Sequence, residues 1–106
     1  MSIFEKMKKK GHEQVIFSYD KETGLKSIIA IHDTTVGPAL GGTRVKVYQN
    51  EEEALEDVLR LSEGMTYKNA AANFYMGGGK AVIMLDENNP KTIEKLRIHA
   101  QYINTL

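Results

Sequence analysis

The residues of this sequence best suited to chemistry are two lysines and a run of glycines. The segment NFYMGGGKAVIML, residues 73–85, places three consecutive glycines directly before Lys80, and Lys68 lies upstream in a predicted helix. One lysine ammonium can anchor a carboxylate, and a second lysine in a water-poor cleft can take part in proton transfer. If the fold brings both lysines to one concave spot, the pair suits a small carboxylate substrate.

A phosphate-binding loop is the first alternative for Gly77–Lys80. A Walker loop follows a strand, opens a helix and needs Ser or Thr after its lysine. Here the glycines follow a predicted helix and precede a predicted strand, and Ala81 comes next. The dinucleotide fingerprint also needs a strand followed by a helix, and neither GPALGG nor MGGGK stands in that context. The pattern therefore argues against phosphate binding.

An interpretation without chemistry also stays open for these residues. Three glycines can make a tight helix-to-strand connection, or they can let a ligand or another chain segment approach the backbone. Lys80 is also compatible with a solvated residue at the start of a strand. Lys68 falls on an apolar helical stripe, where it either extends to solvent or meets an anion in a cleft. That stripe comprises Ala54, Val58, Leu61, Met65, Lys68 and Ala72.

The histidines are weaker candidates. His32 and Asp33, at the end of a predicted strand, could form a ligand pair, but no second cluster at metal-ligand spacing accompanies them. His12 and His99 have neighbours typical of the protein surface. The sequence has no cysteine, which excludes disulfides, thiolate metal sites and cysteine nucleophiles. No metal site is predicted.

Charge and composition limit the partners. Fourteen basic and fourteen acidic side chains give a formal net charge of zero, whereas nucleic-acid and membrane-surface binding depend on a basic excess. No apolar run approaches the roughly 18 residues of a membrane span, and the amino terminus lacks the apolar core of a signal peptide. We expect a soluble cytoplasmic protein that binds neither nucleic acid nor membrane.

The elements that must position the lysines follow from hydrophobic periodicity. The apolar run Ile28–Ile31 predicts a strand buried on both faces, in the middle of a sheet. The succession of strand, long helix and strand favours an α/β fold, a three-layer domain around a mixed, partly parallel sheet. The predicted order is helix 2–11, strands 13–20, 25–33 and 43–48, helix 50–73, strand 80–85 and helix 91–106.

Local signals refine the helices. Ser2 can cap the first helix and Gly11 can end it. Asn50 can cap the long helix, and Gly64 inside it costs about 1 kcal/mol against alanine, so we expect a bend or loosening there. Pro90 fits the first position of the last helix. The predicted inward face of that helix comprises Ile93, Leu96, Ala100 and Ile103.

Three segments together resemble the substrate-binding domain of the amino-acid dehydrogenases, those of glutamate, leucine, phenylalanine and valine. The segments are GPALGGTR at 37–44, GMTYKNAAA at 64–72 and GGGKAVI at 77–83. Their order and spacing make the resemblance specific, and it covers essentially the whole chain. The leucine, valine and phenylalanine branch looks most similar, with the leucine dehydrogenases nearest.

The resemblance implies an enzyme that reversibly deaminates a hydrophobic L-amino acid, of the leucine or valine type, to its 2-oxo acid and ammonia. It implies that Lys68 holds the substrate carboxylate. It also implies that Lys80 is catalytic, polarising the carbonyl or activating the attacking water. The other substrate-binding positions that it implies are Leu40, Gly41, Met65, Gly77 and Gly78.

The implied substrate pocket is apolar. Leu40 and Met65 beside a side-chain-free Gly41 suit a hydrophobic substrate, and no further cation, which glutamate would require, occupies the motif positions. Phe74 and Tyr75 lie in the stretch that is least typical of the family. A phenylalanine-type substrate therefore stays an alternative.

The resemblance also implies a divided protein. Residues 1–106 would form a domain for substrate binding and for contacts within a homo-oligomer. A separate carboxyl-terminal Rossmann domain, absent from this chain, would bind NAD, and the catalytic aspartate of the family also lies downstream. We therefore expect these 106 residues not to turn over substrate alone, and we expect a cut within a larger protein. The alternative is a non-catalytic module that oligomerises and binds amino acids.

Overall fold

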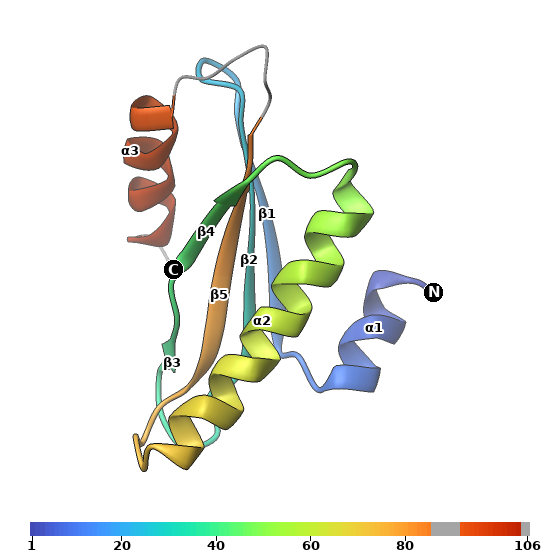
Figure 1. Cartoon of the computed structure of the whole chain (residues 1–106), viewed down its shortest axis with the longest axis vertical. Coiled ribbons are helices and arrows are strands. Elements are labelled where there is room, and N and C mark those ends of the chain that lie inside the picture. Colours follow the sequence, from blue (N-terminus) through green and yellow to red (C-terminus); the bar gives the residue numbers. More distant parts are fainter. Residues whose placement is uncertain (86–91, 105–106) are drawn as a thin grey trace.

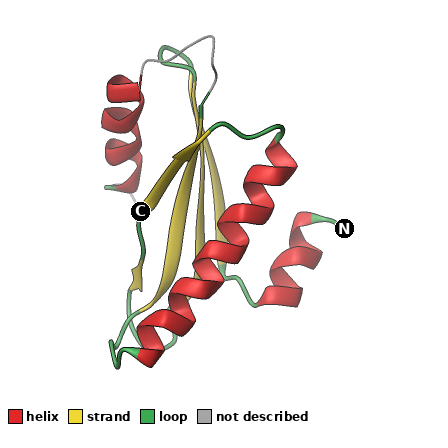
Figure 2. Ribbon diagram, viewed as in Figure 1, coloured by secondary structure: helices red, strands yellow, loops and turns green. Residues whose placement is uncertain are grey.

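A sheet between two helix layers forms the domain. The structure is a computed structural model that describes residues 1–85 and 92–104. Figure 1 shows α2 and α1 on one face of the sheet and α3 on the other, and Figure 2 shows the same layers by secondary structure. The elements are α1 (Ile3–Lys10), β1 (Gln14–Asp20), β2 (Leu25–Asp33), β3 (Ala39–Leu40), β4 (Thr43–Lys46), α2 (Glu51–Ala71), β5 (Gly77–Met84) and α3 (Thr92–Ile103). The predicted three-layer α/β domain is confirmed.

The sheet is mixed, as predicted. Its strands lie in the order β1-β2-β5-β3, and β4 also pairs with β5. β2 runs antiparallel to both of its neighbours, whereas β3 and β4 run parallel to β5. Ile28, Ile29 and Ala30 are buried, which confirms β2 as a central strand covered on both faces.

The helix ends follow the sequence signals. The Ser2 hydroxyl accepts a backbone hydrogen bond from the first turn of α1, and Gly11 ends that helix with a φ of 86°. The Asn50 side chain accepts a hydrogen bond from the Glu53 N–H at 2.8 Å and caps α2. The loosening expected at Gly64 is wrong, because α2 continues unbroken through it. Buried residues of α2 on both sides of Gly64 hold the helix to the sheet, which outweighs a small propensity cost.

The main core lies between α2 and the sheet. Val58 and Leu59 of α2 and Val82 of β5 are completely buried. They belong to one hydrophobic cluster, which joins α2 to β2 and β5. The full cluster is Ile28, Ala30, Tyr48, Ala54, Leu55, Val58, Leu59 and Val82.

The consecutive glycines belong to β5 rather than to a connection. The sequence predicted a strand from residue 80, but β5 begins at Gly77. Gly79 pairs with Ile31 of β2, and Gly77 pairs with Ala39 of the two-residue strand β3, which was not predicted. Pairing on both sides gives these glycines backbone partners, so tertiary contacts override the poor strand propensity of glycine.

α3 packs with a different face from the one expected. The predicted inward residues Ile93, Leu96, Ala100 and Ile103 are all exposed. Lys95 and His99 are buried instead, and His99 Nε2 lies 3.2 Å from the Thr43 hydroxyl of β4. Periodicity finds the residues that share a stripe, but it does not tell which side of the helix meets the sheet. Pro90, predicted to start this helix, lies outside the described residues.

Candidate functional site

The glycines near Lys80 are packed backbone against backbone. A Cβ on Gly78 would overlap the backbone nitrogen and hydroxyl of Thr66 in α2, and a Cβ on Gly77 would overlap the Asp33 carbonyl. A Cβ on Gly41, between β3 and β4, would overlap the carbonyl of the last glycine in the run. Of the explanations that the sequence left open, close approach by another chain segment is therefore present at all three positions.

Lys80 projects from β5 on the face that α2 covers. Side chains alternate along a strand, and Gly78 and Val82, its neighbours two positions away, both face α2. Lys80 is half-buried, and its Nζ lies 3.5 Å from the position that a Cβ on Gly42 would take. Its ammonium has no ion pair or hydrogen bond with any described residue. The charge is therefore available to a bound anion or to negative charge that develops in a reaction.

Lys68 lies in the last turn of α2 and is exposed. The prediction that it lies within the apolar face is wrong, because α2 turns an adjacent face to the sheet. The buried residues of α2 are Ala54, Leu55, Val58, Leu59, Ser62 and Asn69. Lys68 thus stands at the edge of that face, one residue before a buried asparagine. From there its ammonium reaches solvent at the carboxyl end of the helix.

Leu40 borders the glycines from the neighbouring strand. β3 pairs Leu40 with Gly78, and the Leu40 residue is 41% exposed. Met65 is half-buried and stands one position before Thr66, which packs on Gly78. In Figure 1 the start of β5, β3 and the carboxyl-terminal end of α2 meet at one end of the sheet. The predicted site residues gathered there are Leu40, Gly41, Gly77 and Gly78.

A cavity of about 320 Å³ lies on the side of β5 that faces away from α2. Gly79 and Ala81, which alternate with Lys80 along the strand, line it together with Ile103 of α3. Lys80 and Gly41 border this cavity, whereas the predicted residues Leu40, Met65 and Lys68 do not. The expected meeting of both lysines at one concave spot is therefore not found in this cavity.

A buried layer of polar side chains lies behind the glycines. His12 Nε2 lies 2.8 Å from Ser62 Oγ, and His32 Nδ1 lies 2.7 Å from Thr66 Oγ1. The two imidazole rings meet edge to face with centroids 4.7 Å apart. His32 Nε2 lies 2.7 Å from the Lys10 carbonyl, which can only accept, so His32 donates there and accepts from Thr66. Both nitrogens of His32 are occupied, which argues against a metal-ligand role.

Two histidines expected at the surface are buried, so that expectation is wrong for His12 and His99. Burial lowers the pKa of His12 and the adjacent His32 lowers it further, and burial lowers the pKa of His99. Their polar sequence neighbours concealed contacts made with distant elements. A signal was available in α2, where the small polar residues Ser62, Thr66 and Asn69 recur at helical spacing.

Asn69 ties three elements together at this end of the sheet. Its side chain is buried, and its Nδ2 donates to the Gly77 carbonyl at 2.8 Å and to the Leu40 carbonyl at 3.4 Å. The backbone carbonyl of Asn69 accepts a hydrogen bond from the Phe74 N–H at 2.9 Å. No sequence pattern had predicted a role for Asn69.

Metal-ligand clusters and membrane-spanning helices are both absent from residues 1–85 and 92–104. No group of three or more histidine, aspartate or glutamate side chains there could hold a metal ion. No helix there has both the length and the apolar character needed to cross a membrane.

The sequence profile of the family described as "Glu/Leu/Phe/Val dehydrogenase, dimerisation domain" matches residues 12–106. The chain belongs to this family. The leucine dehydrogenase of Bacillus subtilis is 56% identical over 106 residues, which cover 100% of this chain and 29% of that relative. The L-tryptophan dehydrogenase of Nostoc punctiforme is 55% identical over 106 residues, covering 100% and 30%. The phenylalanine dehydrogenase of Lysinibacillus sphaericus is 56% identical over 104 residues, covering 98% and 27%.

Solved structures share the fold of this dehydrogenase domain. The crystal structure of L-tryptophan dehydrogenase from Nostoc punctiforme matches with a TM-score of 0.91 and 54% identity, covering 98% of this chain and 31% of that chain. Glutamate dehydrogenase from Peptoniphilus asaccharolyticus matches with a TM-score of 0.62 and 30% identity, covering 78% and 22%. The family predicted from the three segments is confirmed, and the chain spans less than a third of the length of these relatives.

Proposed function

We propose that this chain is the substrate-binding and oligomerisation domain of an NAD-dependent amino-acid dehydrogenase, whose Rossmann domain follows residue 106 in the complete protein. The substrate is a hydrophobic L-amino acid, converted reversibly to its 2-oxo acid and ammonia. The observation that carries the proposal is the environment of Lys80. This lysine is half-buried in β5, directly after the three glycines, and has no charge partner among the described residues of a chain that belongs to this family. The 106 residues alone are not expected to turn over substrate.

In this proposal Lys80 takes part in the reaction and Lys68 binds the substrate. Conversion of an amine carbon to a carbonyl carbon passes through a carbinolamine, and its formation and collapse move protons and negative charge at one oxygen. The Lys80 ammonium stabilises that charge. In its neutral form the Lys80 amine accepts the proton that the attacking water loses, and the resulting ammonium donates it to the departing amine. Lys68, whose ammonium is exposed at the end of α2, holds the substrate carboxylate.

NAD is the expected cofactor, and it supplies the hydride acceptor when bound. The described residues of this chain do not fit it. A dinucleotide site needs a glycine-rich turn between a strand and the following helix, whereas the glycines here lie inside β5 and follow α2. We therefore assign NAD binding to the other domain of the complete protein.

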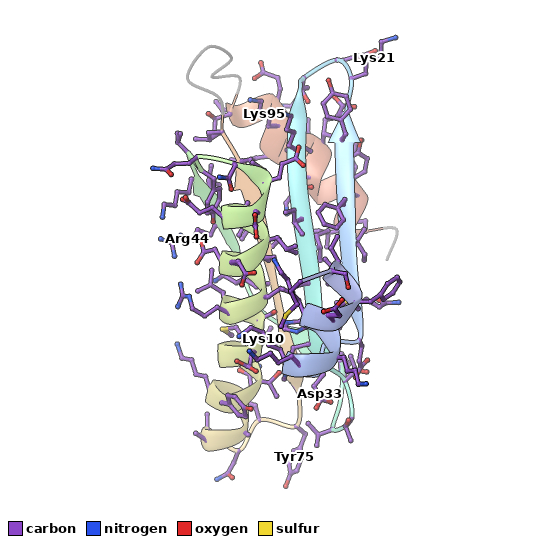
Figure 3. The ribbon with its side chains drawn as sticks, turned by 90° about the vertical axis from the view of Figure 1, so that its right-hand side faces the viewer. Lys10, Lys21, Asp33, Arg44, Tyr75 and Lys95 are labelled. Atoms are coloured by element: carbon purple, nitrogen blue, oxygen red, sulfur yellow. The ribbon has the colours of Figure 1, made fainter. Side chains whose placement is uncertain are left out.

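We propose an aliphatic substrate of the leucine or valine type. Partly exposed Leu40 and half-buried Met65 are apolar, and Gly41 carries no side chain. Relatives of similar identity include tryptophan and phenylalanine dehydrogenases, so an aromatic substrate is the second candidate. Phe74 and Tyr75 are exposed directly after α2, and Figure 3 shows Tyr75 at the end of the molecule opposite to Lys21.

A substrate panel on the complete protein tests the proposed activity. NADH formation is followed with leucine, valine, phenylalanine, tryptophan and glutamate, and we expect the highest kcat/KM with leucine or valine. A preference for phenylalanine or tryptophan would select the second candidate. A preference for glutamate would contradict the apolar pocket, and absence of turnover with every substrate would favour a non-catalytic module.

Substitution of the two lysines tests their roles. Lys80→Ala should lower kcat by about 10²–10⁴-fold, because it removes the group proposed for proton transfer. Lys68→Ala should mainly raise KM, because it removes the carboxylate anchor. Lys9→Ala, at an exposed position of α1, is the matched control. Normal turnover in Lys80→Ala, or an unaltered KM in Lys68→Ala, would remove that residue from its proposed role.

We also propose that the domain self-associates through the outer edge of β1. The family is described as a dimerisation domain, and no described strand pairs with that edge. Phe17 and Tyr19 on β1 are 52% and 62% exposed, and an open strand edge with apolar side chains favours strand addition by a second copy. Phe17→Asp should reduce the sedimentation mass of the complete protein, with Val47→Asp beyond β4 as the control. An unchanged mass would place the interface elsewhere.

The cytoplasmic location stays a prediction.

A further inference from the structure

We infer that Asn69 is a positioning residue, which fixes the wall formed by Leu40 against the strand of Gly77 and Gly78. The inference rests on the proposed function, because those three residues are among the ones assigned to substrate binding. Asn69 itself carries no charge, and its amide is directed at backbone carbonyls rather than at the proposed reacting groups. Its effect on the reaction would therefore be indirect.

The burial and bonding of Asn69 support the inference. The residue is 3% exposed, and a buried side-chain amide is costly unless its polar atoms have partners. Its two contacts, with the carbonyls of Gly77 and Leu40, can only be made by an N–H donor, which fixes the orientation of the amide. One amide on α2 therefore bridges the parallel strands β3 and β5, at the end of the sheet where the predicted site residues gather.

β3 needs such a bridge because its own pairing is short. The strand comprises only Ala39 and Leu40, and a backbone hydrogen bond from the Gly77 N–H to the Pro38 carbonyl, 3.0 Å long, fastens its start. A two-residue parallel pairing has few hydrogen bonds to resist displacement. The Asn69 amide adds a side-chain bond to each strand, so the spacing between Leu40 and Gly77 depends on it.

The same residue also directs the chain out of α2. The backbone carbonyl of Asn69 accepts the Phe74 N–H at 2.9 Å, a bond that does not involve the side chain, and it places the exposed aromatic segment that follows the helix. The side-chain amide of Asn69 therefore holds Leu40 and Gly77, and its backbone carbonyl holds the segment that begins at Phe74. Loss of the amide should widen or displace the pocket without removing either lysine, so substrate binding should suffer more than the chemical step.

Asn69→Asp is the informative variant, because it keeps the shape of the side chain and removes its donor. A carboxylate oxygen would then face two carbonyl oxygens, and the strands should separate. We expect the amino-acid KM of the complete protein to rise on the order of tenfold, the equivalent of one hydrogen bond, with kcat changed less and the KM for NAD unchanged. At lower pH the protonated carboxyl donates again, so the KM defect should shrink as pH falls relative to the unsubstituted protein.

Asn50→Asp is the matched control. It makes the same chemical change at the other end of α2, where an aspartate also caps a helix. It should leave both kinetic constants unchanged. If Asn69→Asp leaves the amino-acid KM unaltered, or lowers kcat alone, the positioning role is overturned.

A readout independent of activity separates this inference from the proposed function. Amide hydrogen exchange at Gly77, whose N–H bonds to Pro38, should be faster in Asn69→Asp than in Asn50→Asp. Unchanged exchange at Gly77 would overturn the bridging role whatever reaction the protein performs. Faster exchange in a protein that turns over no amino acid would instead retain the bridge and reject the proposed function.

Discussion

The two faces of the sheet are covered in different ways. On the face covered by α2, the side chains of Val58 and Leu59 of that helix are entirely removed from water. Against the other face, α3 buries Lys95 and His99, keeps Ile98 half-buried and leaves Ile93 71% exposed. One helix thus supplies a hydrophobic core, and the other contributes mainly polar contacts among the described residues.

This difference shows which face of the sheet contributes most to the stability of the described domain and which face carries the proposed substrate-binding residues. Apolar burial is the dominant favourable term in folding, so the free energy of unfolding should depend mainly on the face under α2. The polar layer of His12, His32, Ser62 and Thr66 lies on the same face, directly behind Gly78. The proposed substrate-binding residues are therefore attached to the face of the sheet that carries the hydrophobic core.

Truncating one leucine on each helix gives the largest expected contrast between the two faces. Leu59→Ala should lower the free energy of unfolding by about 2–5 kcal/mol, because Leu59 is fully buried. Leu96→Ala in α3 should cost less than about 1 kcal/mol, because Leu96 is 42% exposed. Urea unfolding monitored by circular dichroism measures both changes. Equal losses would mean that the two faces contribute alike.

Adding one methyl group on the α2 face gives a somewhat smaller contrast. Gly78→Ala should destabilise the fold by about 1–3 kcal/mol, because the new Cβ would meet backbone atoms of α2, which cannot rotate away. Gly64→Ala, with nothing within 4 Å of its Cβ position, should stabilise α2 by up to about 1 kcal/mol. Thermal unfolding compares the two variants. A stable Gly78→Ala variant would contradict the close packing of α2 on β5.

Mild acid gives the smallest effect and acts on both faces. His12 under α2 and His99 under α3 have pKa values lowered by burial from the ordinary value of 6.5. The unfolded chain therefore takes up protons at a higher pH than the folded one, so the free energy of unfolding should fall as the pH drops below about 6.5. Unfolding curves between pH 7.5 and about 5.5, in the unsubstituted chain, His12→Gln and His99→Gln, measure this. Each substitution should flatten the decline, and a pH-independent unsubstituted chain would contradict the prediction.

Much of the fold was predictable because its signals are local. Ser2 and Asn50 cap helices within one turn of themselves, and Gly11 ends α1 in a conformation that glycine readily adopts. The apolar run in β2 identified a strand covered on both faces. The succession of strand, long helix and strand predicted the α/β class, and the three family segments named the candidate site residues.

The site was predictable in part. Its residues were named from the segments, and Leu40, Gly41, Gly77 and Gly78 do gather at one end of the sheet. Lys68 was assigned to the wrong face of α2. Asn69, which bridges the strands of the site, was missed because an asparagine inside a helix has no distinctive local pattern.

The sequence by itself determined the order of the elements, most of their limits and the family, since these depend on neighbouring residues or on a recognisable series of motifs. Only the tertiary structure decided that Gly77–Gly79 form a strand, that His12 and His99 are buried, and that α3 buries Lys95 and His99 instead of the predicted apolar stripe. The physical reason is that burial and backbone pairing belong to a contact between two segments. Each segment specifies its own surface, and only their assembly determines which surfaces meet.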